Sequence, residues 1–200
     1  MAAIPAGFSA QDYLLLEQDN SVRHEYRHGF VYAMAGGSDD HDELCLNLIE
    51  LLRQQVRSQG CAVRSGNVKV NYADAFFYYP DAFVTCDPRD QVDRDVKRYP
   101  KFVAEVLSPS TANFDRGEKF ADYRQIESLE EYVLIFQDQM RVECWRRSFG
   151  ARRSQLQDAT QERWESQVYG PGETVVLESV GLVVAIERLY QDVNLAPVHP

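Results

Sequence analysis

The run Phe-Val-Ala-Glu-Val-Leu at residues 102–107 constrains the fold of this chain more than any other stretch. A continuous apolar run of this length predicts a central strand in a sheet that is covered on both faces. Alternate residues of a strand point to opposite faces, so Glu105 is the one charge on the face that it shares with Val103 and Leu107. An isolated buried charge is costly unless it finds a partner, and a divalent metal ion is such a partner.

A second carboxylate, Asp81, begins another strand-like segment after Tyr79 and Pro80. The fixed φ of Pro80 keeps the chain extended at that point. If the two strands are neighbours, Asp81 and Glu105 reach one point and supply the hard oxygen ligands that Mg²⁺ or Mn²⁺ prefers. The alternative is that Asp81 is a strand-end carboxylate satisfied by backbone N–H groups.

The segment after residues 108–111 predicts a helix over about 112–126, and Asp115, Lys119 and Tyr123 fall four apart on one of its faces. A lysine that faces a metal-bound phosphate stabilises the charge that develops in the transition state. The arrangement therefore indicates phosphodiester hydrolysis. The alternative for Lys119 is a solvated side chain that pairs with Asp115. Tyr123 either belongs to the core or lines the site with its hydroxyl at the edge.

The rest of the chain predicts two more helices and several short strands. Helices are expected at 9–18 and from Asp39 to a stop at Gly60, and a hairpin at 24–34 turns at His28-Gly29. Strands are expected at 61–63, 68–70, 78–86, 129–136 and 140–145, with short closing strands between 164 and 184. The charged stretch 87–101 has no periodicity and predicts a surface loop.

Length and charge limit the possible functions. The chain has 200 residues, of which 44% are apolar, which suits a single domain over 1–200 with a core at about 9–190 and tails at 1–8 and 192–200. The net charge of −10 argues against broad binding of polyanions or anionic membranes, so a nucleic-acid substrate needs metal ions or a local basic patch. One basic cluster is a candidate patch or a solvated hairpin face: Arg141, Arg146, Arg147, Arg152 and Arg153.

The four cysteines, Cys45, Cys61, Cys86 and Cys144, show no CxxC pairing, and the N-terminus has no signal-peptide pattern. We therefore expect a reducing cytoplasm and cysteines that act as small buried apolar residues. The apolar runs fall short of the roughly 18 residues that a membrane helix needs, so no membrane span is expected.

The motifs, taken in order, resemble the PD-(D/E)XK nucleases and specifically the Uma-two family of restriction-endonuclease-like proteins, once classified as a domain of unknown function. The resemblance covers residues 9 to about 190. Its most specific pieces are Glu-Val-Leu-Ser-Pro-Ser-Thr at 105–111 and Asp-Arg-Gly-Glu-Lys at 115–119. Further matching pieces are His24-Glu25-Tyr26, Ala33-Met34-Ala35-Gly36-Gly37, His41, Tyr79-Pro80-Asp81, Tyr123 and Glu131-Tyr132-Val133-Leu134.

The resemblance implies an α/β fold in which a mixed central β-sheet is flanked by helices, with extra β-strands in the C-terminal part. It implies that Asp81 and Glu105 bind the metal with Glu25 as a third acidic contributor, and that Lys119 assists catalysis. The chain departs from the superfamily pattern at Leu107, where the strand lysine usually stands. In this family the lysine has moved to the following helix, and Lys119 matches that place.

Two site residues have structural alternatives. Glu25 lies between Arg23 and Arg27 in sequence, so a cross-hairpin ion pair is the alternative to metal binding. His41 follows two aspartates at a helix start, and it either caps the helix or lines the site.

Together these features predict a Mg²⁺- or Mn²⁺-dependent endonuclease, with DNA favoured as substrate by the resemblance. Cutting both strands with one site per chain suggests a homodimer or a higher homo-oligomer. A catalytically inactive nuclease-fold binding or accessory subunit is the main alternative, since no recognition domain accompanies the acidic chain. An acid/base hydrolase that uses Asp81 and Glu105 without metal is a third possibility.

Overall fold

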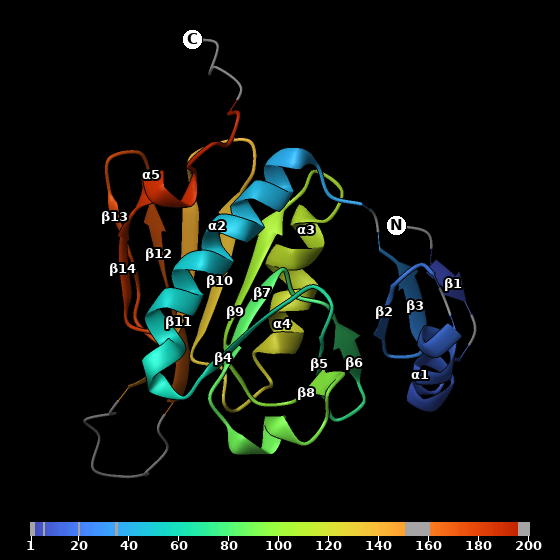
Figure 1. Cartoon of the computed structure of the whole chain (residues 1–200). Coiled ribbons are helices and arrows are strands. Elements are labelled where there is room, and N and C mark those ends of the chain that lie inside the picture. Colours follow the sequence, from blue (N-terminus) through green and yellow to red (C-terminus); the bar gives the residue numbers. More distant parts are fainter. Residues whose placement is uncertain (1–2, 6, 20, 35, 151–160, 196–200) are drawn as a thin grey trace.

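The computed structural model describes residues 3–5, 7–19, 21–34, 36–150 and 161–195 (Figure 1). Within these residues two six-stranded sheets and a two-stranded sheet form the β structure. The N-terminal sheet has, in spatial order, β1 (Ala3–Pro5), β3 (Phe30–Ala33), β2 (His24–Arg27), β6 (Phe76–Tyr78), β5 (Lys69–Tyr72) and β8 (Val96–Lys97). The central sheet has β12 (Gln161–Tyr169), β11 (Val142–Gly150), β10 (Glu131–Phe136), β9 (Pro100–Leu107), β7 (Ala82–Thr85) and β4 (Ala62–Ser65). The two-stranded sheet pairs β13 (Thr174–Leu177) with β14 (Leu182–Ala185).

The fold is mixed α/β, as the sequence predicts. In the central sheet β9 runs parallel to β10 and antiparallel to β7. The longer helices are α1 (Ala10–Asp19) and α2 (Asp39–Val56), and α2 lies across one face of the central sheet (Figure 1). Short helical segments complete the set: η1 (Arg57–Gln59), η2 (Pro88–Gln91), α3 (Ala112–Phe114), η3 (Asp115–Lys119), α4 (Phe120–Tyr123) and α5 (Ile186–Leu189).

Strand β9 is buried on both faces, which explains its continuous apolar sequence. Phe102, Ala104 and Val106 pack in one core cluster with the apolar stripe of α2. Val103 and Leu107 pack in a second cluster with residues of the N-terminal sheet and α4. The period of two therefore assigns Glu105 to the second face, between Val103 and Leu107.

Local sequence features explain several of the observed elements. His28 and Gly29 both have positive φ, 46° and 90°, and they turn the β2–β3 hairpin as the sequence predicts. Ser9 and Asp12 exchange hydrogen bonds at the start of α1, where the Ser9 hydroxyl accepts from the Asp12 N–H at 3.1 Å. Gly60, with φ 72°, ends the helical run after α2 and η1.

Several boundaries differ from the predictions. The expected strand 78–86 is divided at Tyr79-Pro80-Asp81, so that β6 joins the N-terminal sheet and β7 joins the central sheet. The expected N-terminal tail contains β1, which pairs with β3. The helix expected over 112–126 ends with α4 at Tyr123.

The prediction of a surface loop over 87–101 was wrong, because hydrogen bonds to Asp90 order this segment. The buried Asp90 carboxylate accepts hydrogen bonds from the Thr85 hydroxyl at 2.6 Å and from the backbone N–H groups of Arg98 and Tyr99. The backbone carbonyl of Asp90 accepts from Lys97 Nζ at 2.7 Å. These contacts hold η2, β8 and the start of β9 in place, although the sequence there shows no periodicity.

The cysteine prediction was wrong for one pair. Cys61 and Cys86 form a disulfide between the ends of β4 and β7, which are adjacent antiparallel strands. Cys144 is buried in the core and Cys45 is partly buried, and both are free. Among the described helices, none combines the length and the apolar character that a membrane crossing requires.

Candidate metal-dependent active site

Asp81 and Glu105 lie side by side, because β7 and β9 are neighbouring antiparallel strands. The register pairs Ala82 with Ala104, which brings Asp81, one residue before β7, next to Glu105. The Val106 N–H donates to Asp81 Oδ2 at 2.8 Å, and the Asp81 N–H points to Glu105 Oε2 at 3.4 Å. The two side chains that the sequence placed on separate strands therefore lie side by side and line one cavity.

Lys119 is buried against three carboxylates. Its Nζ lies 2.9 Å from Glu105 Oε1, 3.2 Å from Glu25 Oε1 and 3.6 Å from Asp115 Oδ1. The Lys119 side chain is only 6% exposed, so the solvated-lysine alternative does not hold. A buried ammonium group needs such partners, since desolvation of an unpaired charge is strongly unfavourable.

A π-helical turn carries Lys119 to this position. Residues 112–123 form one helical run in which η3, from Asp115 to Lys119, is π-helical. Such turns are rare and occur often at functional sites. Asp115 and Lys119 are both buried on this turn, and Tyr123 follows on α4 with its hydroxyl donating to Glu105 Oε1 at 3.2 Å.

Glu25 comes from the other sheet. It lies on β2, and its Oε1 accepts from the Tyr79 N–H at 2.9 Å as well as from Lys119. The alternative of a cross-hairpin ion pair is not observed, since Arg27 pairs with Asp122 and Arg23 donates to Asn67. The Lys119 ammonium group joins Glu25 to Glu105.

His41 lies at the first turn of α2, with its Nε2 3.3 Å from Asp81 Oδ2. The helix cap is Ser38, whose hydroxyl accepts from the His41 backbone N–H at 3.2 Å. The His41 side chain is therefore free of the capping role and faces the site. Its Nδ1 approaches Cys45 Sγ at 3.6 Å.

Burial and charge shift the pKa values of this cluster. Burial raises the pKa of Glu105 well above its ordinary value, against the opposing effect of the Lys119 ammonium group. Burial likewise raises the pKa of Glu25, again opposed by Lys119. Burial acts to lower the pKa of Lys119, but Glu105, Glu25 and Asp115 outweigh it and hold that pKa well above its ordinary value. Lys119 is therefore a permanent cation at neutral pH.

The cluster lines a cavity of about 100 Å³. Four carboxylates and one ammonium group face it, so the ionised side chains carry an excess of three negative charges: Glu25, Asp81, Glu105, Asp115 and Lys119. Asp81 and Glu105 suit a divalent cation, because Mg²⁺ and Mn²⁺ prefer carboxylate oxygens and tolerate further water ligands. Burial disfavours the ionised form of Glu105 and raises its pKa, and a bound cation would offset this cost.

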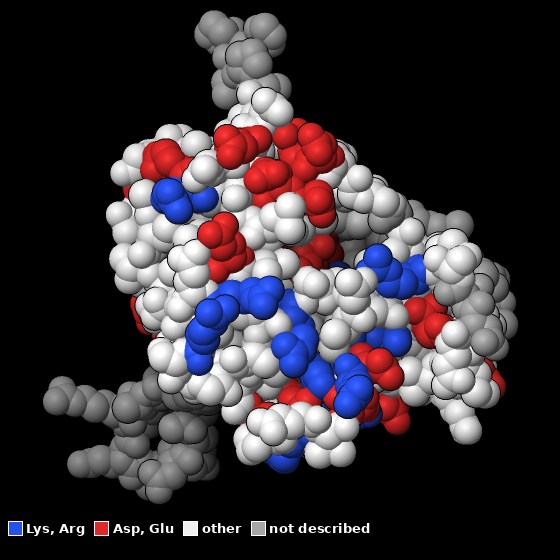
Figure 2. All heavy atoms as spheres, viewed as in Figure 1, with Lys and Arg blue, Asp and Glu red and all other residues white. Residues whose placement is uncertain are grey.

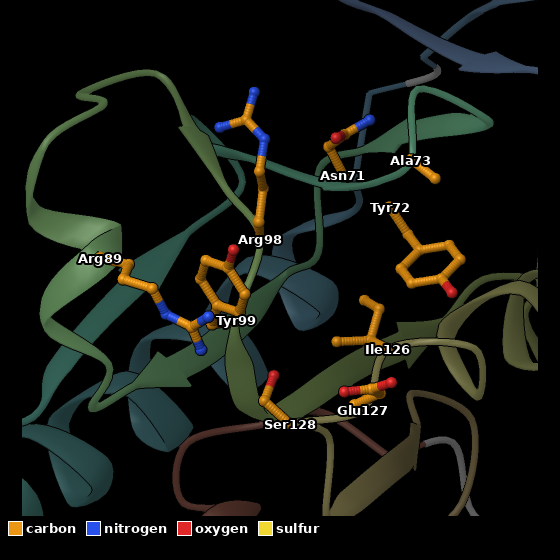
Figure 3. A pocket seen from close by; sticks show the side chains of 9 residues that line it. All are labelled: Asn71, Tyr72, Ala73, Arg89, Arg98, Tyr99, Ile126, Glu127 and Ser128. Carbon is orange, nitrogen blue, oxygen red and sulfur yellow. The ribbon is translucent and has the colours of Figure 1, made fainter.

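A second cavity, of about 440 Å³, shares no lining residue with the first (Figure 3). Arg89 lies over the Tyr99 ring, 3.6 Å from its centroid, and pairs with Asp87. Arg98 pairs with Asp93 at 3.2 Å. Both guanidinium groups are thus engaged by carboxylates, and we assign no anion site to this cavity.

The arginine cluster near β11 supports the structure. Arg146 donates to the fully buried Glu131 at 2.9 Å, and Arg141 pairs with Glu143 at 2.7 Å. The Arg147 guanidinium donates to the backbone carbonyls of Arg124, Ile126 and Glu127. Arg152 and Arg153, the other members of the predicted cluster, lie outside the described residues.

Two residues of the site were not among those predicted. The sequence places Asp115 on one helix face with Lys119 and Tyr123 but gives it no role in the site, and the structure buries it with Lys119. Its position four residues before Lys119 was the available signal. Cys45 was interpreted as an apolar core residue, and its spacing of four from His41 on α2 was the signal that placed the two side chains on one helix face.

Comparisons with known proteins point to one family. A family model of Uma2, described as "Putative restriction endonuclease", matches residues 10–178. Two proteins of Synechocystis sp. are similar in sequence, each named only as uncharacterized. The protein slr1290 is 30% identical over 184 residues, covering 92% of this chain and 91% of its own length. The protein sll1609 is 32% identical over 142 residues, covering 70% and 80%.

A solved structure shows the same fold. It is a crystal structure of "a putative nuclease belonging to DUF820" from Anabaena variabilis, with a TM-score of 0.72 at 16% identity. The match covers 92% of this chain and 97% of that one. Since the family model spans most of the chain and slr1290 matches along nearly all of it, this protein belongs to the Uma2 family.

Proposed function

We propose that the protein is a metal-dependent endonuclease that hydrolyses phosphodiester bonds in DNA. The observation that carries the proposal is the meeting of Asp81 and Glu105 beside a buried Lys119 in an acidic cavity. Membership of a family described as restriction endonucleases supports the nuclease class. Metal, substrate and residue roles are the parts that we propose.

In this proposal Asp81 and Glu105 hold Mg²⁺ or Mn²⁺, and Glu25 is the third acidic contributor. A bound divalent cation supplies Lewis-acid polarisation of a phosphate oxygen and acidifies water. The Val106 N–H fixes Asp81, and the Tyr123 hydroxyl and Lys119 fix Glu105, so the carboxylates are oriented before the substrate arrives. For Glu25 to become a ligand, its contact with Lys119 must loosen.

Lys119 supplies positive charge to the transition state. Its raised pKa keeps it protonated, so it stabilises negative charge on the phosphate but does not act as a base. The position of the usual strand lysine is taken by Leu107, which is buried in the apolar cluster on the same face of β9. The π-helical turn brings the ammonium group of Lys119 back to the Glu105 carboxylate from the helix side.

DNA is the proposed substrate, although the chain is acidic overall. One face of the molecule separates the charges, with acidic side chains gathered over the start of α2 and a band of Lys and Arg crossing below them (Figure 2). The first turn of α2 carries Asp39, Asp40 and Asp42, while Arg53 lies in its last turn. Phosphate groups are attracted to such a basic band even on a protein with net negative charge.

A homodimer or a higher homo-oligomer is part of the proposal, because one site per chain cuts one strand at a time. A cytoplasmic location is also part of the proposal and rests only on DNA as the substrate. The sequence predicted a reducing compartment from cysteines expected to be unpaired. The Cys61–Cys86 disulfide removes that argument, since disulfides persist mainly in oxidising compartments.

The test is cleavage of supercoiled plasmid with Mg²⁺ or Mn²⁺, together with a calorimetric Mn²⁺ titration. Asp81→Asn and Glu105→Gln are expected to lose the metal-binding heat and to cut at least about a hundredfold more slowly, since metal ligation accounts for several kcal/mol of transition-state stabilisation. Glu143→Gln is the control, because Glu143 is a buried carboxylate on β11 that pairs with Arg116 and Arg141 outside the cavity.

Metal heat without cleavage of any plasmid would support the binding-subunit alternative. Cleavage that continues in EDTA would support the metal-free carboxylate pair. Either result contradicts the proposed mechanism, as does a Glu143→Gln variant that loses activity to the same extent as Glu105→Gln.

A further inference from the structure

We propose that His41, Cys45 and Asp81 form a second binding site, which takes a zinc-class divalent cation and shares Asp81 with the Asp81–Glu105 pair. One donor atom from each of the three residues lies within 4.8 Å of the other two. Imidazole nitrogen, thiolate sulfur and carboxylate oxygen together are typical zinc ligands, whereas Mg²⁺ avoids sulfur.

The spacing of the first two donors suits a tetrahedral ion. Zn–S and Zn–N bonds of usual length at a tetrahedral angle separate sulfur and nitrogen by roughly 3.5 Å. Cys45 Sγ lies 3.6 Å from His41 Nδ1. The two residues are one turn apart on α2, so the helix itself sets this separation.

The other nitrogen of His41 faces Asp81, with Nε2 3.3 Å from Oδ2. The two nitrogens of an imidazole point to opposite sides of the ring, so this contact and a bond from Asp81 to an ion at Nδ1 exclude each other. Asp81 therefore leaves Nε2 when the cation binds and becomes its third ligand. Coordination displaces the thiol proton of Cys45 to solvent, so cation binding releases protons.

A route to solvent exists on the side away from Glu105. His41, Cys45 and Asp81 all line an open groove of about 640 Å³ between α2 and the turn at Ser65-Gly66-Asn67. Asp42 lies on the same groove and adds negative charge at its mouth. Water from this groove can complete the coordination of a cation that has three protein ligands.

Cobalt(II) is the probe, because it replaces zinc in such sites and reports sulfur ligation by its absorption. Titration without reducing agent keeps Cys61 and Cys86 in their disulfide, so that Cys45 and Cys144 are the two free thiols. We expect a thiolate-to-cobalt charge-transfer band in the near ultraviolet for the wild type. Cys45→Ser should lose this band, and Cys144→Ala, which removes the other thiol, should retain it.

The remaining variants separate this site from the proposed active site. Glu105→Gln should keep the cobalt band while losing its Mn²⁺ heat. His41→Asn should bind cobalt about tenfold or more weakly, as expected when an imidazole ligand is removed. Circular dichroism verifies that each variant is folded, and protection of Cys45 from alkylation by Zn²⁺, mapped by mass spectrometry, gives a second measurement. Absence of the band at saturating cobalt, or an equal band in Cys45→Ser, overturns the inference.

Occupation of this site withdraws Asp81 from the hard-metal pair, so zinc should inhibit Mg²⁺-dependent cleavage. This consequence rests on the proposed function. Each variant is compared with its own rate without zinc, and Cys45→Ser should need about tenfold more zinc for half inhibition, by the loss of one ligand. A cobalt band in a protein that cuts no DNA contradicts the proposed nuclease alone, and active enzyme without the band contradicts this site alone.

Discussion

The Nζ atom of Lys119 lies 2.9 Å from Oε1 of Glu105, and both side chains are buried. The contact connects a π-helical turn to the central strand of the sheet. Glu25 and Asp115 approach the same ammonium group, so three carboxylates share one positive charge. Stability and chemistry at this site therefore depend on the same few atoms.

Lys119→Met should lower the free energy of unfolding by about 3–5 kcal/mol at neutral pH, because it leaves buried carboxylates without their cation. Urea denaturation measures the change. Lys101→Met is the matched control, since Lys101 is partly exposed and lies 3.6 Å from the exposed Glu130. That surface pair should contribute less than about 1 kcal/mol. Equal losses in the two variants would contradict the structural role assigned to Lys119.

Mn²⁺ affinity should rise with pH. The pKa values of Glu105 and Glu25 are raised above 4.5 in the folded protein, so the native state binds more protons than the unfolded chain between 4.5 and the raised values. Their contribution to stability is then complete below pH 4.5 and is lost as pH rises through the folded pKa values. A cation that needs the ionised carboxylates must displace these protons.

Calorimetry in buffers of different ionisation enthalpy counts the protons that Mn²⁺ releases. Glu25→Gln removes one of the two groups and leaves Asp81 and Glu105 in place, so it should release fewer protons per Mn²⁺ ion. Proton release that does not change with pH would contradict the assignment of Glu105 and Glu25 as the titrating groups.

Gly37→Ala should disturb His41, whereas Gly36→Ala should not. A Cβ at Gly37 would lie 3.0 Å from His41 Nδ1 and 3.3 Å from its Cγ, closer than ordinary contact. A Cβ at Gly36 meets nothing within 4 Å. Since Nδ1 is the nitrogen that faces Cys45, cobalt affinity should fall several-fold in the first variant and stay unchanged in the second. Equal cobalt titrations for both variants would show that the ring moves aside without loss of the site.

Reduction of the Cys61–Cys86 disulfide should lower the free energy of unfolding by about 2–4 kcal/mol, because the cross-link restricts the unfolded chain. Cys86→Ser should show the same loss without reductant. Adding reductant to Cys86→Ser should then have no further effect. A reductant effect that persists in this variant would assign the stabilisation to another group.

Part of this site could be predicted from local sequence. Glu105 was identifiable because one charge in an apolar strand has few alternatives, and the period of two fixed the face on which it lies. The hairpin at His28-Gly29 was readable because two residues with positive φ specify that turn. Lys119 and Asp81 needed the resemblance, since each has a common structural alternative.

The remaining features depend on contacts between distant segments. The stretch around Asp90 has no periodicity, because its order comes from hydrogen bonds to Thr85, Arg98 and Tyr99. The sequence does not show that β6 and β7 belong to two sheets, because both lie within one apolar run. The disulfide joins Cys61 to Cys86 across a strand pairing that their spacing alone does not specify.

Glu25 belongs to the N-terminal sheet and Glu105 to the central sheet, and Lys119 touches both. The proposed catalytic pocket therefore lies between the two sheets and belongs to neither sheet alone. A substitution far from the pocket that moves one sheet away from the other would separate Glu25 from Glu105. Activity would therefore measure how well the two sheets stay packed together.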